Sequence, residues 1–464
     1  MSTDKTLCRY AWDYPIVTFH RNGLRACCRA APSTVTSADI QKHGIELFSN
    51  FAPIVQMRKD LLNGVQTKAC ESCWKVEAAG GRSARTDMNA MVNFAAGWNL
   101  FGTKDPAAIV DRFNNLSEED IQRLATVDTP RMVEIALSNV CDLKCMYCNH
   151  HYSSQWGVEL VKYNEIQPHQ LEEEFPKPNA EYQALFWKWF NERAWKTVTS
   201  INFIGGEPLL VDEFYEAMDR ILAVYEADPE GVPSQGVTFS IVTNFNTPER
   251  QFNRFIAFLD RVFAIPRMKL DLIVSAETFG AKAQFIRTNC RWVTVDTNIR
   301  KFLAATALIS IDQCRFGFIP SNNTLSISSL PEFVHYAWLL NQRYGRPVQL
   351  RQNQIVYPRW LSPSLLPASY ARYIDEALAF IDGHPVDESH MPVYGKWSTF
   401  KDFLLTIRTT IDKPEQEKDH HERRFFKTRV LQLADRRHLN LYATFPEMHK
   451  FLNMIEVLDD TDSN

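Results

Sequence analysis

Three cysteines in one short loop are the residues of this chain best suited to chemistry. Cys141, Cys145 and Cys148 lie within "NVCDLKCMYCNHHY", residues 139–152, at intervals of four and three. Three thiolates alone cannot complete a tetrahedral structural zinc site, which would need one of the two following histidines as its fourth ligand. They could instead hold an iron–sulfur cube whose fourth iron stays open to chelate a small molecule. The spacing therefore leaves a zinc site and an iron–sulfur cluster as alternatives.

A second set of cysteines lies near the amino terminus. It consists of the Cys-x-x-Cys pair Cys70 and Cys73, with Cys8, Cys27 and Cys28 further upstream. Such a pair with two distant thiols suffices for zinc or for an iron–sulfur cluster. An "RNG" segment just before the adjacent pair predicts a hairpin turn. The spacing does not decide which of the two adjacent cysteines would complete the set.

Composition limits the class of protein. The chain of 464 residues is long enough for two or three domains, and its net charge of −4 argues against a cationic protein that coats nucleic acid. No stretch approaches the ~20 apolar residues of a membrane helix, and the start lacks the apolar core of a signal peptide. We therefore expect a cytoplasmic protein with no membrane partner. Because the cytoplasm is reducing, its ten cysteines indicate metal binding rather than disulfides.

Alternating strands and helices follow from residue 131 onward. The predicted strands are 131–138, 198–206, 237–245, 269–277, 315–321 and 347–356. The predicted helices between them are 181–195, 211–227, 248–264 and 330–345. This alternation predicts an α/β fold with a parallel sheet, in the form of a partial (β/α)6 TIM-like barrel. The three-cysteine loop directly follows the first strand, at the end where such folds bind ligands.

Three domains are expected along the chain. Residues 1–125 form a small cysteine-rich domain, residues 126–364 the partial barrel, and residues 365–464 a helical carboxy-terminal extension. A capped helix ends the first domain, with Ser117 as its N-cap and Asp120 three residues later.

The three-cysteine loop resembles the motif of the radical SAM superfamily. That motif has the same spacing with an aromatic residue before the third cysteine, a position that Tyr147 occupies. The resemblance implies that Cys141, Cys145 and Cys148 hold a 4Fe–4S cluster that binds S-adenosylmethionine (SAM). It also implies that Tyr147 packs beside the adenine of SAM.

The ends of later strands extend this resemblance. The segment "FIGGEP" is similar to the family's GGE-type motif, which binds the amino group of SAM through Gly205, Gly206 and Glu207. The resemblance implies further contacts with the cofactor. Thr243 and Asn244 would face it as a polar pair, Ser275 would contact the ribose, and Arg287 would pair with the methionyl carboxylate. Glu277 could also touch the ribose. An ammonium suits the Glu207 carboxylate, and a planar guanidinium fork suits the methionyl carboxylate.

The amino-terminal cysteines resemble the twitch domain, a shorter relative of the SPASM domain that binds one auxiliary 4Fe–4S cluster. The resemblance implies Cys8, Cys70 and Cys73 as ligands, with Cys27 slightly favoured over Cys28 as the fourth. In better-known enzymes this domain follows the barrel, whereas here it would precede it. A zinc knuckle that only stabilises a small domain is the alternative. Cys290 and Cys314 are expected to be buried thiols rather than ligands.

The resemblance implies an enzyme that reductively cleaves SAM and abstracts a hydrogen from its substrate. The favoured substrate is a peptide or protein side chain. The alternatives are a nucleotide, a hypermodified base or another small metabolite, so a nucleic-acid partner is possible but not favoured. Such chemistry would need an electron donor such as flavodoxin or ferredoxin. A zinc-stabilised interaction protein without enzymatic activity is the remaining alternative.

Overall fold

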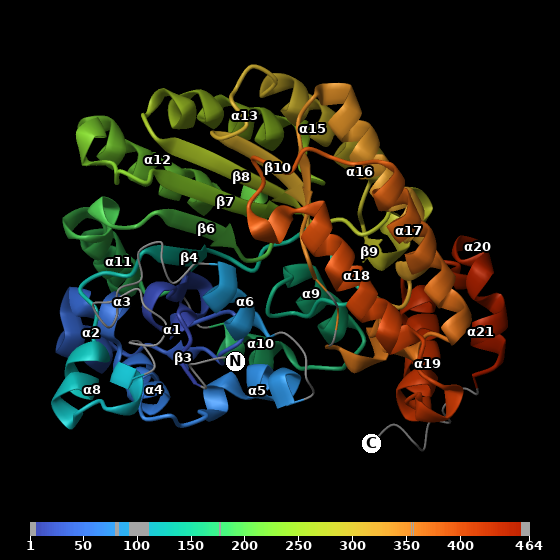
Figure 1. Ribbon diagram of the computed structural model, residues 1–464, viewed down its shortest axis with the longest axis horizontal. Helices are drawn as coiled ribbons and strands as arrows, with labels where there is room; N and C mark the ends of the chain where they lie inside the picture. Colours follow the sequence, from blue (N-terminus) through green and yellow to red (C-terminus); the bar gives the residue numbers. More distant parts are fainter. Residues whose placement is uncertain are drawn as a thin grey trace. The chain divides into compact units, whose positions relative to one another are not determined.

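A nine-stranded, mostly parallel sheet organises this α/β fold (Figure 1). The computed structural model describes residues 6–78, 83–91, 111–175, 178–353, 355 and 357–455. The strand order in the sheet is β11-β10-β8-β7-β6-β4-β1-β2-β3. The predicted α/β class with a parallel sheet is therefore confirmed.

The six predicted strands are all present with shifted ends, and the last, predicted over 347–356, is much shorter. They are β4 (Met132–Ala136), β6 (Ser200–Ile204), β7 (Val237–Thr243), β8 (Met268–Val274), β10 (Cys314–Phe318) and β11 (Val348–Leu350). They lie in the sheet in chain order, each beside the next. The four predicted helices are α11 (Ala180–Glu192), α12 (Asp212–Ala227), α13 (Glu249–Ala264) and α16 (Leu330–Tyr344).

Alternating burial explains how a strand of this sheet presents two different faces. In β6, Ile201 and Phe203 are fully buried, and the Phe203 ring packs edge-on against Phe214 of α12 at 5.1 Å. Ser200 and Asn202 alternate with them and are only partly buried. Because successive side chains of a strand point to opposite faces, the strand has one apolar, helix-covered face and one polar face.

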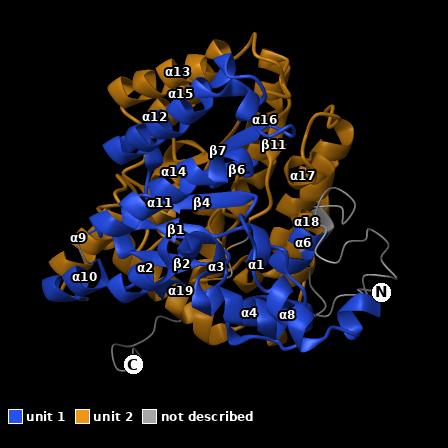
Figure 2. Cartoon of the chain, turned by 90° about the vertical axis from the view of Figure 1, so that its left-hand side faces the viewer, with its two compact units in different colours: residues 1–138, 166–240, 262–269 blue, residues 139–165, 241–261, 270–464 orange. Residues whose placement is uncertain are grey.

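The chain divides into two compact units, drawn in separate colours in Figure 2. The first contains residues 1–138, 166–240 and 262–269. Its amino-terminal part adds β1 (Ile16–Thr18), β2 (Gly23–Arg25) and β3 (Ser33–Thr34) to the sheet. β1 pairs in parallel with β4 and antiparallel with β2, so the predicted hairpin turn is present, with Asn22 in the left-handed conformation. These three strands were not predicted, because runs of two or three residues carry no periodicity.

The predicted capped helix is α8 (Glu118–Leu124) of this first unit. Ser117 and Asp120 form a reciprocal capping box at its start, as the sequence predicts. Each partner satisfies a backbone N–H group that the first helical turn leaves without an intrahelical acceptor.

The second unit contains residues 139–165, 241–261 and 270–464. It includes the cysteine loop, a two-stranded sheet of β5 (Lys144–Cys145) with β9 (Arg287–Thr288), and α9 (Ser154–Lys162). Its carboxy-terminal part is mainly helical, as predicted, with α17 (Ala371–Gly383), α18 (Trp397–Ile411) and α19 (His420–Arg436) as its longest helices. Within the described residues, no helix is long and apolar enough to cross a membrane. The three-domain division stays a prediction.

Candidate functional site

Backbone pairing holds the three-cysteine loop in a defined conformation. The loop follows β4, and the β5–β9 ladder places Cys145 opposite Arg287. The N–H of Met146 donates to the carbonyl of Ile286 at 2.8 Å, and the indole N–H of Trp156 donates to the Cys145 carbonyl at 2.8 Å. A further turn forms where the Cys148 N–H donates to the Cys145 carbonyl at 3.0 Å. A loop with these bonds positions its thiols without help from a ligand.

The loop thiols are poorly hydrated and receive nitrogen donors. Cys145 is buried, and Cys141 and Cys148 are half-buried. Burial raises the pKa of Cys145 to about 11, against a lowering effect of Arg287, and raises the pKa of Cys148 to about 12. Asn244 Nδ2 lies 3.8 Å from the Cys141 sulfur, and Arg287 Nη1 lies 3.9 Å from the Cys145 sulfur. These donors favour the thiolate form that a metal requires, while burial keeps the metal-free thiols of Cys145 and Cys148 protonated.

The spacing of the sulfurs bears on which metal group they fit. Among the described residues, no three cysteine sulfurs lie within 4.8 Å of one another. A tetrahedral zinc ion with Zn–S bonds of ~2.3 Å would hold its thiolates about 3.8 Å apart. An iron–sulfur cube spreads its thiolates over several irons and separates them more widely. In this structure the sulfurs are therefore not at the spacing at which one zinc ion would bind three of them.

Tyr147, Glu277 and Arg287 form a cluster beside the cysteine loop, in which Glu277 and Arg287 are buried. The Tyr147 hydroxyl lies 3.2 Å from Glu277 Oε2, and Arg287 Nη2 lies 2.6 Å from the same oxygen. The Arg287 guanidinium also lies 5.4 Å from the centre of the Tyr147 ring. Burial by itself would lower the pKa of Arg287, but the Glu277 carboxylate outweighs it and the pKa is raised. Arg287 therefore stays charged.

The partner of Arg287 was not part of the sequence-based expectation. Arg287 was expected to hold the methionyl carboxylate, and in this structure its fork is engaged by Glu277. Glu277 lies at the carboxyl end of β8 and its side chain is fully buried. Its place ten residues before Arg287 gave no signal of the pair, because the two meet only through the packing of the β8–β9 segment.

A network of amides holds the loop from the end of β7. Asn244 Nδ2 donates to Asp142 Oδ1 at 2.9 Å, and Asn246 Nδ2 donates to Asp142 Oδ2 at 2.6 Å. The residues on either side of Asn244 also bond to each other, because the Phe245 N–H donates to Thr243 Oγ1 at 3.0 Å. Sequence analysis missed Asp142 and Asn246. For Asn246, the second asparagine of "TNFN" was the signal available in the sequence.

Ser275 occupies the corresponding position at the end of β8. It is half-buried, and its N–H donates to the Thr243 carbonyl at 2.8 Å. This bond ties the carboxyl ends of β7 and β8 together. Thr243, Asn244 and Ser275 are thus grouped with the cysteine loop within the second unit.

The Gly-Gly-Glu segment belongs to the first unit and follows β6. Gly205 has a φ of +132°, and a Cβ atom there would lie 2.5 Å from the Ser138 carbonyl oxygen. The Gly206 N–H donates to that same oxygen at 2.9 Å, so the close approach requires a glycine. Glu207 is 1% exposed, and its carboxylate accepts from the Leu209 N–H at 3.2 Å. The segment therefore has a structural role as a tight turn beside the end of β4.

Four of the amino-terminal cysteines come together in the first unit. Cys8, Cys27, Cys70 and Cys73 are buried, whereas Cys28 is exposed. Burial raises the pKa of Cys8, and the neighbouring Cys27 and Cys70 raise it further. Burial likewise raises the pKa of Cys27, with smaller contributions from Cys70 and Cys73. The structure thus groups Cys27, rather than its exposed neighbour, with the other three.

Backbone N–H groups and a buried guanidinium group lie near these amino-terminal thiols. Backbone N–H groups of Tyr10 and Ala11 donate to Cys8, which counteracts part of the rise in its pKa. Arg85 of α6 (Ala84–Met91) is buried, donates to the Leu7 carbonyl at 2.8 Å and contributes a lowering effect to the pKa of Cys70. Donors of this kind stabilise the thiolates of a bound metal group.

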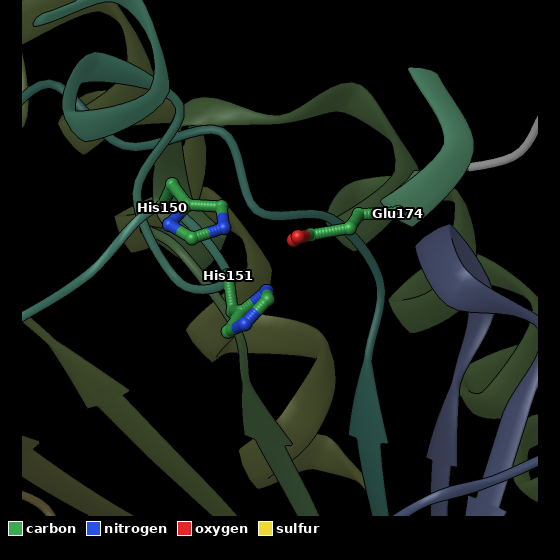
Figure 3. Close-up of side chains that lie close together, drawn as sticks. All are labelled: His150, His151 and Glu174. Atoms are coloured by element: carbon green, nitrogen blue, oxygen red, sulfur yellow. The ribbon is translucent and has the colours of Figure 1, made fainter. Parts of the chain in front are cut away.

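Two histidines follow the third loop cysteine. Figure 3 shows His150 and His151 next to each other on the loop, and their ring centroids are 4.2 Å apart with an interplanar angle of 41°. Glu174, drawn with them, belongs to the first unit. The two rings are the residues that a Cys3His zinc site would have to recruit.

Comparisons with known proteins found no match. No model of a known protein family matches the chain, and no curated protein matches its sequence.

Proposed function

We propose that this protein is a radical SAM enzyme whose 4Fe–4S cluster is held by Cys141, Cys145 and Cys148. The observation that carries the proposal is the loop itself. It holds three thiols, two of them with nitrogen donors, and it comes directly after the first of six strands that follow one another in chain order. A partial (β/α)6 barrel is the finer form of the fold that this proposal includes.

The residues around the loop have roles that suit such a cofactor. When bound, the cluster and SAM together supply a 5′-deoxyadenosyl radical for hydrogen abstraction. Tyr147 is held in place by Glu277 and Arg287, so its ring can pack against adenine without losing further conformational freedom. Asn244 and Asn246 anchor Asp142 and so keep the loop in its chelating conformation.

The amino-terminal thiols would hold a second cluster. Cys8, Cys27, Cys70 and Cys73 can supply four thiolates, which leaves no open iron for SAM. This auxiliary cluster would bind substrate or conduct an electron. The favoured substrate is a peptide or protein side chain, and flavodoxin or ferredoxin would donate electrons.

Anaerobic purification followed by iron and sulfide analysis tests the proposal. We expect about eight irons per chain, four at each site, and formation of 5′-deoxyadenosine from SAM with dithionite as reductant. Replacing any of Cys141, Cys145 or Cys148 by Ala should abolish that product. Zinc without iron, or unchanged cleavage in one of these variants, would reject the proposal.

The two metal sites can be separated by a second variant. The double replacement of Cys70 and Cys73 by Ala should leave about four irons and measurable 5′-deoxyadenosine, with product from the true substrate lost. A folded double variant with normal product formation would show that the amino-terminal site has no part in catalysis.

A further inference from the structure

A charged cluster lies on three strands of the second unit, outside the cysteine loop. Asp271 lies on β8, Arg315 on β10 and Gln349 on β11, with Arg351 just after β11. Strand register places Arg315 opposite Asp271, and Gly317 opposite Gln349. Because alternate residues of paired strands share a face, all four side chains leave the same face of the sheet.

This face is opposite to the one that packs against the helix after β9 and against α16. Phe316 and Phe318 of β10 alternate with Arg315 and point the other way. Phe316 packs against Phe302 of α15 (Trp292–Ala305) at 5.8 Å, and Phe318 packs against Phe333 of α16 at 5.2 Å. Arg315 therefore points away from α15 and α16.

The cluster is built with close and specific contacts. Arg351 forms an ion pair with Asp271, whose side chain is 2% exposed, and Gln349 Nε2 donates to Asp271 Oδ1 at 3.0 Å. The carboxy-terminal extension contributes Tyr394 from a short helix, Val393–Gly395, and the Arg351 guanidinium lies 4.7 Å from the centre of its ring. A Cβ on Gly317 would lie 2.4 Å from Gln349 Cβ, so only a glycine at this position leaves room for the Gln349 side chain.

The cluster carries a net positive charge. Its two guanidinium groups share one carboxylate, and Asp271 is already paired with Arg351. Within the described part of the chain, Arg315 has no ion-pair partner. The Nε atoms of Arg315 and Arg351 are buried without a hydrogen-bond acceptor. Buried donors and a half-buried cation without partners are unfavourable, and an oxyanion would satisfy both.

We propose that Arg315 and Arg351 form a binding site for an oxyanion, a carboxylate or a phosphate group, that the substrate carries. The anion binds between the two guanidinium groups, and the ring of Tyr394 packs against Arg351. The role of this site in anchoring the substrate rests on the proposed function, whereas anion binding by the cluster does not. The substrate is then an acidic molecule or an acidic segment of a peptide.

Titration of the full-length, anaerobically purified protein with inorganic phosphate and with acetate tests the site. At constant ionic strength, we expect one of the two probes to raise the melting temperature saturably, and the probe that does so identifies a phosphate or a carboxylate site. Arg315→Gln should weaken this binding about tenfold or more, because it removes the unpaired cation. The matched control Arg343→Gln, at an exposed position of α16, should bind as the wild type does.

A third variant gives an effect that misfolding cannot imitate. Asp271→Asn removes the carboxylate that competes with the anion for Arg351, and should tighten probe binding several-fold. Absence of saturable binding by the wild type, wild-type affinity in Arg315→Gln, or weaker binding in a folded Asp271→Asn variant would each overturn the proposal.

The test is independent of the proposed radical chemistry. Probe binding is measured without SAM, and SAM cleavage is measured without the probes. Loss of the proposed function would appear as an absence of iron and of 5′-deoxyadenosine in the wild type. Failure of the anion site would appear only in the titrations.

Discussion

Arg437 and Glu159, which are 278 residues apart in the sequence, form a fully buried ion pair beside the cysteine loop. Arg437 Nη2 lies 2.8 Å from Glu159 Oε1, and the two side chains are 0% and 3% exposed. Arg437 also donates to the Lys144 carbonyl at 2.9 Å and stacks over Trp156 at 4.6 Å. Because Lys144 precedes Cys145 in β5, the carboxy-terminal extension braces the strand that carries the second loop cysteine.

Replacing this arginine should destabilise the protein strongly. Arg437→Gln leaves a buried carboxylate with only Lys144 as its cationic partner, and we expect a loss of about 3–5 kcal/mol in the free energy of unfolding. Arg408→Gln, which breaks an exposed pair with Asp375, should leave the melting temperature nearly unchanged. Thermal unfolding of both variants beside the wild type provides the measurement. Equal melting temperatures for the two would contradict a bracing role.

The glycine at the end of β6 should not tolerate a side chain. Gly205→Ala combines an unfavourable φ of +132° with a collision at the Ser138 oxygen, so we expect a loss above about 2 kcal/mol. Gly383→Ala is the matched control, because nothing lies within 4 Å of a Cβ at that helical position. It should be neutral or stabilise by up to about 1 kcal/mol. Urea unfolding of both variants checks the difference.

The two adjacent amino-terminal cysteines should differ sharply in their effect on metal content. Cys27→Ala removes a buried thiol grouped with three others, and iron should fall from about eight to about four per chain. Cys28→Ala removes a thiol that does not act on Cys8 and should leave the iron content unchanged. Iron analysis of the two purified variants shows which of the two cysteines is the ligand. The opposite pattern would assign the ligand role to Cys28.

The thiols of Cys145 and Cys148 should react slowly when no metal is bound. The pKa of Cys148 is about 12 and that of Cys145 about 11, because burial disfavours the thiolate. A raised pKa leaves the thiol protonated at pH 8, and the reactive thiolate fraction grows about tenfold per pH unit until the pKa is reached. Alkylation by iodoacetamide, mapped by mass spectrometry on chelator-treated protein, should therefore still accelerate between pH 9 and pH 10.5. A rate that levels off near pH 8.5 would show an ordinary, hydrated thiol.

The sequence by itself predicted the features that depend on local pattern. Six apolar runs alternating with amphipathic segments predicted the strands and helices of the sheet, since period and length are local properties. Ser117 with Asp120 predicted a capped helix for the same reason. The spacing of Cys141, Cys145 and Cys148 indicated that their loop is the candidate site. The chemistry proposed for it rests on that spacing and on the resemblance to the radical SAM motif.

Tertiary structure alone decided which distant residues meet. The pairing of Arg287 with Glu277, the selection of Cys27 over Cys28 as the neighbour of Cys8, and the reach of Arg437 to Glu159 all depend on chain segments that no local pattern connects. The same holds for β1, too short to show a period, which joins the sheet only because β4 offers it a free edge. Burial is the common physical reason, because a charge or thiol removed from water needs partners that only the folded chain supplies.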